Sequence, residues 1–318
     1  MDILVTGGAG FIGSHLCDKL LMLGHRVTVM DNLLTGSADN IKHLLENKSF
    51  QFIEHDVIEP IPSGSRWNWI FHMASPASPV GYWMYPLETM LVNSVGTHNL
   101  LKHAAATGAK FLLTSTSEVY GDPLEHPQTE SYRGNVNPVG PRACYDEGKR
   151  YAEAISALFV QKYGVDGRIV RIFNTYGPRN HPEDGRVIPN FITQALTGKP
   201  ITIYGDGSQS RSLCYVSDMV DGLIKAMVTD ESKGQVINLG NPDERTVLEI
   251  GKLIRKLVGS SSPVEFLPGR DEEVSRRCPD ITKARQALGW EPKITLEDGL
   301  RQTIEWIREQ LALTATNK

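Results

Sequence analysis

The sequence predicts an α/β protein built on a Rossmann-type, doubly wound parallel sheet, with a smaller C-terminal α/β lobe. Short apolar runs of strand length alternate with longer helical stretches as far as about residue 175, and a glycine-rich turn follows the first run. The alternation is lost afterwards. The 318 residues suffice for one large domain or two modest ones. We expect a sheet domain at residues 1–175 and a smaller lobe at 176–318, with some strands and helices crossing back between them.

The expected strands are short runs rich in β-branched, aromatic and other apolar residues, at residues 3–6, 26–30, 50–54, 69–73, 110–114 and 168–172. The helical stretches between them include residues 12–23, 87–106 and 145–163. Beyond residue 175, pieces such as "ITIYGDG" and "VLEIGKLIRKLVG" are joined by Gly- and Pro-bearing loops. Because ligands usually bind at the carboxyl ends of the strands in such a sheet, we expect the functional site there.

The composition is that of an ordinary soluble globular protein, with 40% hydrophobic residues and a formal charge of −4. Nothing in it suggests a nucleic-acid surface. The four cysteines, Cys17, Cys144, Cys214 and Cys278, form no CxxC pair, so we expect free thiols. No group of histidines has the spacing of metal ligands, so we expect no metal site. The chain as given shows neither a basic leader nor an apolar run of about 18 residues, which predicts a cytoplasmic location without a membrane span.

The first strand end carries "TGGAGFIGSH", in which Gly7, Gly10 and Gly13 form a Gly-x-x-Gly-x-x-Gly turn. Such glycines allow a tight turn and close approach of a pyrophosphate to a helix N-terminus. A glycine triplet alone also fits a structural turn. Here Asp31 stands at the end of the second strand, where its carboxylate can accept hydrogen bonds from an adenosine ribose and would repel a 2′-phosphate. The pattern predicts NAD rather than NADP.

Two further stretches belong to the same edge of the sheet. "LLTSTSEVYG" ends a strand in hydroxyl residues followed by Glu118, and "GPRACYDEGKR" places Tyr145 and Lys149 four residues apart, on one face of a helix. Each stretch also fits a purely structural role, because hydroxyl-rich strand ends are common in turns and a single Tyr/Lys pair is common on amphipathic helices. Together with the glycine turn, they predict a site that converges on one cofactor.

On these motifs, and on "HDV", "SPASP", "RIFNTYGPR", "YVSDMVDGL" and "LGWEP", the chain resembles the extended short-chain dehydrogenase/reductases that act on nucleotide sugars, over essentially its whole length. The glycine turn and Tyr-x-x-x-Lys are shared by that superfamily, whereas "SPASP" and "GPRACYDEGKR" are narrower and point to its UDP-glucuronate decarboxylase (UDP-xylose synthase) branch. The resemblance implies NAD-dependent decarboxylation of UDP-glucuronate to UDP-xylose through a 4-keto sugar, with NAD recycled in each turnover.

The resemblance also implies a role for each catalytic residue. Tyr145 is the acid/base at the sugar 4-hydroxyl, with a pKa brought from ~10 toward ~7 by Lys149 and the positive nicotinamide ring. Lys149 also holds the nicotinamide ribose, and Thr116 bonds the same sugar oxygen. Glu118 and Ser117 lie near C5 and the carboxylate, where Glu118 helps to drive carboxylate loss. The sixth expected catalytic residue, a proton donor or carboxylate partner, is Arg211.

The binding residues are assigned by motif position. Cofactor residues, besides Tyr145 and Lys149, are Gly7, Gly10, Phe11, Ile12, Gly13, Asp31, Asn32, Asp56, Val57, Ala74 and Asn93. Residues expected to shape the sugar pocket are Pro76, Ser78, Tyr82 and Arg142. Residues expected at the UDP moiety are Asn174, Arg179, Arg186, Tyr204 and Arg270. For each arginine the alternative is a surface ion pair.

Three other functions stay open. A nucleotide-sugar 4,6-dehydratase would need an aspartate where Ser117 stands, and a 4-epimerase needs no glutamate at position 118. A non-catalytic NAD-binding regulator would typically lack the tyrosine or the lysine, and both are present. Relatives pair through two helices that correspond to residues 87–106 and 145–163, so we expect a homodimer with a four-helix interface, aided by apolar side chains at Met90, Leu91, Leu101, Ala154 and Leu158.

Overall fold

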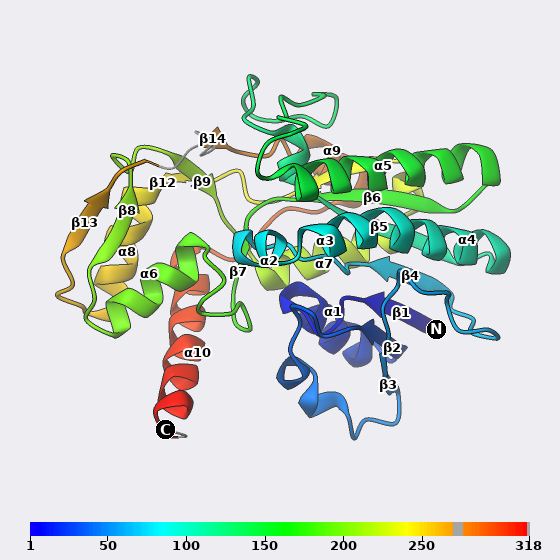
Figure 1. Ribbon diagram of the computed structural model, residues 1–318, viewed down its shortest axis with the longest axis horizontal. Coiled ribbons are helices and arrows are strands. Elements are labelled where there is room, and N and C mark those ends of the chain that lie inside the picture. Colours follow the sequence, from blue (N-terminus) through cyan, green and yellow to red (C-terminus); the bar gives the residue numbers. More distant parts are fainter. Residues whose placement is uncertain (270–275, 317–318) are drawn as a thin grey trace.

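The computed structural model describes residues 1–269 and 276–316, and its centre is a seven-stranded sheet (Figure 1). Every neighbouring pair of strands is parallel. The strands, from one edge to the other, are β3 (Phe50–Glu54), β2 (Arg26–Asp31), β1 (Asp2–Thr6), β4 (Trp69–His72), β5 (Lys110–Thr116), β6 (Gly167–Ile172) and β11 (Val236–Leu239). The predicted doubly wound sheet is confirmed, and its order reverses between β1 and β4, where such folds bind ligands.

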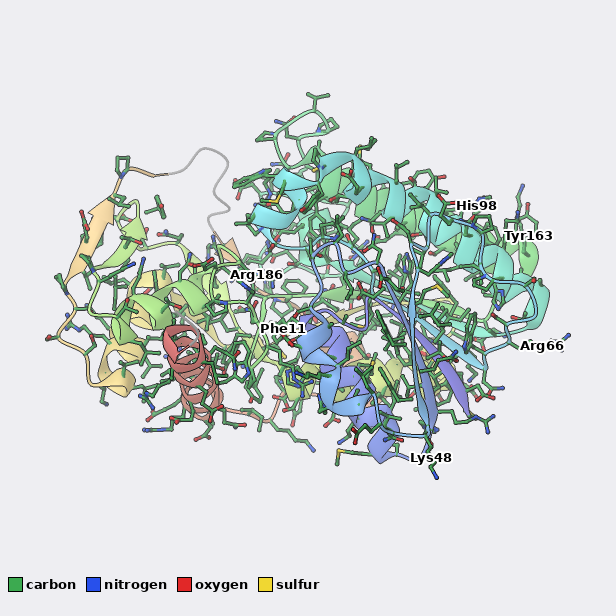
Figure 2. All side chains as sticks on the ribbon, turned by 60° about the horizontal axis from the view of Figure 1, so that its bottom comes forward. Phe11, Lys48, Arg66, His98, Tyr163 and Arg186 are labelled. Carbon is green, nitrogen blue, oxygen red and sulfur yellow. The ribbon has the colours of Figure 1, made fainter. Side chains whose placement is uncertain are left out.

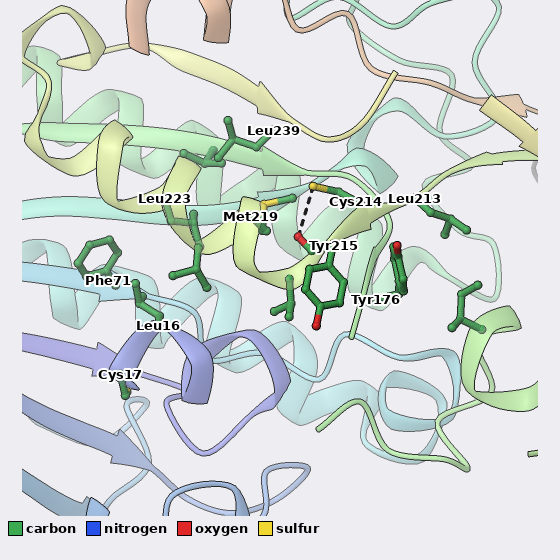
Figure 3. Close-up of a cluster of buried hydrophobic side chains, with 14 of the residues drawn as sticks. Leu16, Cys17, Phe71, Tyr176, Leu213, Cys214, Tyr215, Met219, Leu223 and Leu239 are labelled. Carbon is green, nitrogen blue, oxygen red and sulfur yellow. Dashed lines mark hydrogen bonds between the residues drawn. The ribbon is translucent and has the colours of Figure 1, made fainter. Parts of the chain in front are cut away.

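Helices cover both faces of this sheet because its strands are apolar on both sides. In β1, Ile3 and Val5 join the core cluster beneath α1 (Phe11–Met22) and α7 (Val216–Val228), part of which is drawn in Figure 3. Leu4 points the other way, into the cluster beneath α4 (Thr97–Thr107) and α5 (Ala143–Tyr163). The alternation of side chains along each strand thus fixes both layers.

The expected helix at residues 87–106 is interrupted. After α2 (Pro79–Met84), α3 (Pro86–Leu91) runs into a π-helical turn, Val92–Gly96, before α4 begins. Polar side chains of this segment reach the end of β4: Thr97 Oγ1 lies 3.0 Å from His72 Nε2, and Asn93 Nδ2 donates to Ser75 Oγ at 2.9 Å. The wide turn is where the helix adjusts to these bonds.

The smaller lobe is built from short sheets and helices that lie at one end of the main sheet (Figure 1). Its strand pairs are β8 (Ile201–Tyr204) with β13 (Val264–Leu267) and β7 (Thr175–Tyr176) with β10 (Cys214–Tyr215). A three-stranded sheet has the order β12 (Glu244–Thr246), β9 (Ser210–Ser212) and β14 (Arg276–Arg277). Its helices are α6 (Val187–Leu196), α8 (Val247–Val258) and α10 (Leu296–Thr316), whereas α9 (Thr282–Leu288) packs against β11 and α7 at the edge of the main sheet.

The division of the chain at residue 175 stays a prediction. The second half contributes β11 and α7 to the main sheet and its cover, so elements cross back between the expected units. Within the described residues, no helix has both the length and the apolar character that a membrane crossing requires.

Candidate active site

A cavity of about 450 Å³ opens at the carboxyl ends of the central strands. Its walls come from both halves of the chain: Phe11 at the start of α1 and Arg186 just before α6 both line it (Figure 2). The glycine turn, the end of β5 and the start of α5 all reach it, as the sequence predicts. Its size suits a small-molecule ligand.

The glycine turn forms a cradle that side chains would fill. Gly7 has a φ of +72°, and a Cβ there would come within 2.7 Å of the backbone of Ala74, while a Cβ on Gly13 would overlap the carbonyl oxygen of Gly7. The cap of α1 is Gly10, so no side chain competes for the N–H groups of its first turn. This arrangement fits a pyrophosphate at a helix N-terminus.

Asp31 is fixed at the end of β2 by two backbone bonds. Its Oδ2 accepts from Ala9 N at 3.0 Å and its Oδ1 from Leu33 N at 2.9 Å. Burial raises the pKa of this carboxyl above its ordinary value, although both bonds oppose the rise. The side chain ties the glycine turn to β2 and lies in the cavity wall, where it fits a ribose hydroxyl.

Most expected cofactor residues line the cavity: Gly7, Gly10, Phe11, Ile12, Gly13, Asp31, Asn32, Asp56, Val57, Ala74, Tyr145 and Lys149. Asn93 is not part of the lining. It is fully buried and bonds Ser75 and the carbonyl oxygen of Thr89, so it supports the wall from behind.

Tyr145 and Lys149 are both buried at the start of α5. Lys149 Nζ donates to the carbonyl oxygen of Thr114 at 3.0 Å, and burial lowers its pKa to about 7. Burial also raises the pKa of Tyr145 to about 12, while a hydrogen bond with Thr116 acts to lower it. The expected lowering of the tyrosine pKa toward ~7 is therefore not produced by the protein's own groups. The positive nicotinamide ring is the remaining expected source.

The ring of Tyr145 lies against the ring of Tyr82. The two centroids are 5.3 Å apart and the rings are nearly parallel, at 10°. Tyr82 belongs to α2 and is itself buried, and its backbone carbonyl accepts from Cys144 Sγ at 3.6 Å. The stack fixes the plane in which the Tyr145 hydroxyl lies. The sequence placed Tyr82 near the sugar but gave no sign of this contact.

Glu118 lies between two arginines. Its carboxylate accepts a hydrogen bond from Arg142 Nη2, and its Oε1 is 2.8 Å from Arg277 Nη1. Burial would raise the pKa of Glu118, but the charges of Arg277 and Arg142 outweigh it and hold that pKa at about 2. The side chain is therefore a carboxylate at neutral pH.

Arg277 is a site residue that sequence reasoning missed. It is almost fully buried, lines the cavity, and also donates to Ser117 Oγ at 3.1 Å and to the carbonyl oxygen of Gly121 at 2.9 Å. Its segment, "SRRCPD", carries no motif that pointed to the site. Arg211, the expected carboxylate partner, lies on the neighbouring strand β9, lines the cavity and adds a smaller lowering of the Glu118 pKa.

The described residues among those expected at the substrate divide into two groups. Those that line the cavity are Pro76, Tyr82, Arg142, Asn174, Arg186 and Arg211. Three others are not in its lining: Ser78 caps α2, Arg179 pairs with Asp18 on α1 at 2.8 Å, and Tyr204 ends β8. Arg270 lies outside the described residues. Arg179 therefore forms an ion pair with Asp18, which is the alternative that the sequence left open for each arginine.

Comparisons with known proteins agree with this architecture. A family model described as GDP-mannose 4,6 dehydratase matches residues 4–303. UDP-glucuronic acid decarboxylase 1 of Danio rerio is 52% identical over 316 residues, which cover 99% of this chain and 75% of the relative.

Two solved structures share the fold. UDP-glucose 4-epimerase of Thermotoga maritima, with UDP-glucose, has a TM-score of 0.89 at 34% identity. The match covers 98% of this chain and 100% of the epimerase chain. UDP-glucuronic acid 4-epimerase of Bacillus cereus, in complex with UDP-glucuronic acid and NAD, has a TM-score of 0.86 at 30% identity with the same coverage. The chain belongs to the UDP-glucuronic acid decarboxylase family, within the extended short-chain dehydrogenase/reductases.

Proposed function

We propose that this chain decarboxylates UDP-glucuronate to UDP-xylose, with NAD as its recycled cofactor. The observation that carries the proposal is Glu118, an ionised carboxylate held between Arg142 and Arg277 in the cavity that contains Tyr145. The decarboxylase relatives and the Bacillus cereus structure with UDP-glucuronic acid and NAD support the choice of substrate and cofactor.

The residues present fit NAD. The glycine turn would hold the pyrophosphate, Asp31 the adenosine ribose and Lys149 the nicotinamide ribose. When bound, NAD supplies reversible acceptance of a hydride from C4 of the sugar. The protein's own part in that step is the proton: Tyr145 Oη exchanges it with the 4-oxygen, and Thr116, which is hydrogen-bonded to Tyr145, holds the hydroxyl in place.

Oxidation at C4 changes the chemistry of the carboxylate at C6. A carboxylate β to a ketone loses carbon dioxide to leave an enolate, which is far more stable than an isolated carbanion. The enolate then takes a proton at C5, and C4 is reduced again. No other redox partner is needed, because the electrons removed from C4 return to it.

The Glu118 group suits the carboxylate step. Arg211 and Arg277 give the end of the cavity a positive charge that attracts the sugar carboxylate, while the Glu118 carboxylate repels it. Loss of carbon dioxide removes that repulsion. Because the pKa of Glu118 is held at about 2, Glu118 acts through its charge and is not the proton donor at C5 near neutral pH.

The runner-up function is 4-epimerisation of the same sugar nucleotide, because the Bacillus cereus epimerase binds UDP-glucuronic acid on this fold. A 4,6-dehydratase lacks support, since Ser117, which accepts a bond from Arg277, stands where its acid would be. A non-catalytic regulator would not need Tyr145 and Lys149 in the cavity wall.

We also propose a homodimer through the two expected helical segments, α3–α4 and α5. Exposed apolar side chains lie on α3 and α5 at Leu87, Met90 and Leu158, and on the preceding α2 at Trp83 and Met84. Of the side chains expected to contribute, Leu101 is fully buried in the core and is withdrawn. Light scattering of the wild type and of Leu158→Asp tests the homodimer, and a monomeric wild type would exclude it.

A cytoplasmic location also stays part of the proposal, and the four unpaired thiols support it.

The decisive experiment incubates the purified chain with NAD and UDP-glucuronate and resolves the products. Carbon dioxide with UDP-xylose supports the decarboxylase, and UDP-galacturonate without carbon dioxide supports the epimerase. Absence of both products with a folded, NAD-loaded protein would contradict the proposal.

A further inference from the structure

Three potential metal ligands meet outside the active-site cavity. His126 lies in the loop between β5 and α5, Glu244 begins β12, and Cys278 follows β14. Their ligand atoms, a ring nitrogen, a carboxylate oxygen and Sγ, all lie within 4.8 Å of one another. We propose that these side chains form a binding site for a thiophilic divalent cation of the zinc class.

The donor set selects the class of cation. Hard cations such as Mg²⁺ and Ca²⁺ prefer oxygen ligands, whereas imidazole together with a thiolate favours Zn²⁺. Three protein ligands leave the fourth tetrahedral position to water. The sequence gave no sign of the site because the three residues are far apart in the chain.

The side chain of Arg276 already places a positive charge at this point. Its Nη2 lies 2.8 Å from both His126 Nε2 and Glu244 Oε2, and those two atoms are 3.3 Å apart. Arg276 therefore lies between these two ligand atoms, at the position that a bound cation would take. Arg276 is about half exposed, so it can turn into solvent when a cation replaces it.

The positions of the ligands are set by the fold. Buried Gln128, two residues beyond His126, donates its backbone N–H to Cys278 O and accepts from Cys278 N through its side chain, both at 2.9 Å. Glu244 is held by pairing of β12 with β9 and by a bond from the Ser210 hydroxyl. The main chains that carry the ligands are therefore already arranged.

Binding requires one proton to leave. Cys278 Sγ donates its S–H to the carbonyl oxygen of Pro242 at 3.5 Å, so the group carries a proton in this structure. As the metal–sulfur bond forms, the S–H bond breaks and the proton passes to solvent, with no change of oxidation state. Affinity should therefore rise with pH.

The site is next to the catalytic group along the chain. Arg277, between Arg276 and Cys278, turns to the cavity and pairs with Glu118. A cation that displaces Arg276 and holds Cys278 therefore acts on both neighbours of that arginine. Binding itself does not depend on the proposed reaction.

The test is titration of the chelator-treated, full-length protein with Zn²⁺ by calorimetry, and with Co²⁺ by absorption spectroscopy. We expect one equivalent of Zn²⁺ to bind, and a thiolate-to-cobalt absorption band. Cys278→Ser should remove the band and weaken Zn²⁺ binding by about tenfold or more. Arg276→Ala should tighten binding severalfold, because it removes the competing charge. Cys144→Ser is the matched control and should leave both the Zn²⁺ affinity and the cobalt absorption band unchanged.

His126→Ala offers a second test, since His126 is partly exposed and its loss should leave the fold intact. It should weaken Zn²⁺ binding as Cys278→Ser does. Failure of the wild type to bind a stoichiometric ion would overturn the proposal, as would unchanged affinity in both Cys278→Ser and His126→Ala. Loss of the cobalt band in Cys144→Ser alone would place the site elsewhere and overturn it too.

Discussion

Arg277 Nη1 lies 2.8 Å from Glu118 Oε1, which joins a strand of the small lobe to the end of the central sheet inside one cavity. Both side chains are largely buried, so the pair is screened little by solvent. Its consequence is a glutamate that stays ionised where carboxylate chemistry is expected.

Arg277→Ala should lower kcat/KM for UDP-glucuronate by about 10²-fold or more, because a buried carboxylate loses its partner and the sugar carboxylate loses an attracting charge. Arg277→Lys keeps the charge but not the bonds to Ser117 and Gly121, and should be intermediate. Steady-state kinetics measure both. The control is Arg285→Ala, a half-exposed arginine paired with Glu291, which should behave as wild type. Equal activity of Arg277→Ala and wild type would remove Arg277 from the site.

Tyr82 should act by positioning Tyr145. Tyr82→Phe keeps the stacked ring and should change kcat little, whereas Tyr82→Leu removes the stack, worth about 1 kcal/mol, and should lower kcat by about fivefold or more. The pH–rate profile is the second readout, since a loosened Tyr145 should titrate at a different pH. Identical profiles and rates in the two variants would show that the stack has no such role.

Asp31 should set the preference for NAD. Asp31→Ala removes an acceptor and a negative charge, so NAD should bind about tenfold more weakly and the gap to NADP should narrow. Asp31→Asn, which keeps the shape and one acceptor, should lie between. Equilibrium binding of both cofactors measures this, and equal affinity of the wild type for NAD and NADP would contradict it.

Glu118 should also make stability depend on pH. Its pKa is lowered from 4.5 to about 2 in the folded protein, so its contribution is full above about pH 4.5 and is lost as the pH falls toward about 2. Between about pH 5 and pH 3 this amounts to about 2 kcal/mol of unfolding free energy. Denaturant unfolding should show a smaller loss in Glu118→Gln than in wild type. The exposed control Glu297→Gln should lose as much as wild type.

Features set by local pattern could be predicted from the sequence. The strands of the main sheet up to β6, the glycine turn and the Tyr145–Lys149 helix were expected close to where they lie, because strand-length apolar runs and glycine spacing are local signals. The π-helical turn at Val92–Gly96 could not be predicted, because the apolar pattern there resembles that of a continuous helix.

Contacts between segments that are distant in the chain could not be predicted from the sequence. Strand β11 joins the sheet through pairing with β6, and Arg277 reaches Glu118 because β14 pairs with β9 beside the cavity. Burial raises the pKa of Tyr145 in the protein without NAD, because α2 packs over the phenol, and the sequence gave no sign of this packing. Such outcomes depend on tertiary packing and leave no local signature.

The central claim is that Tyr145 serves oxidation at C4 and Glu118 serves the carboxylate loss that follows. Tyr145→Phe should show no absorbance of reduced nicotinamide on mixing with UDP-glucuronate, because the proton acceptor is gone, and its rate should fall by about 10²- to 10⁴-fold. Tyr151→Phe, an exposed tyrosine on the same helix, is the matched control.

The most direct measurement is a single-turnover experiment on Glu118→Gln loaded with NAD, following reduced nicotinamide and carbon dioxide together after UDP-glucuronate is added. This substitution keeps the size of the side chain but removes the charge that repels the sugar carboxylate. Our account predicts that reduced nicotinamide accumulates while carbon dioxide appears far more slowly than in wild type. Release of carbon dioxide at the wild-type rate would contradict it.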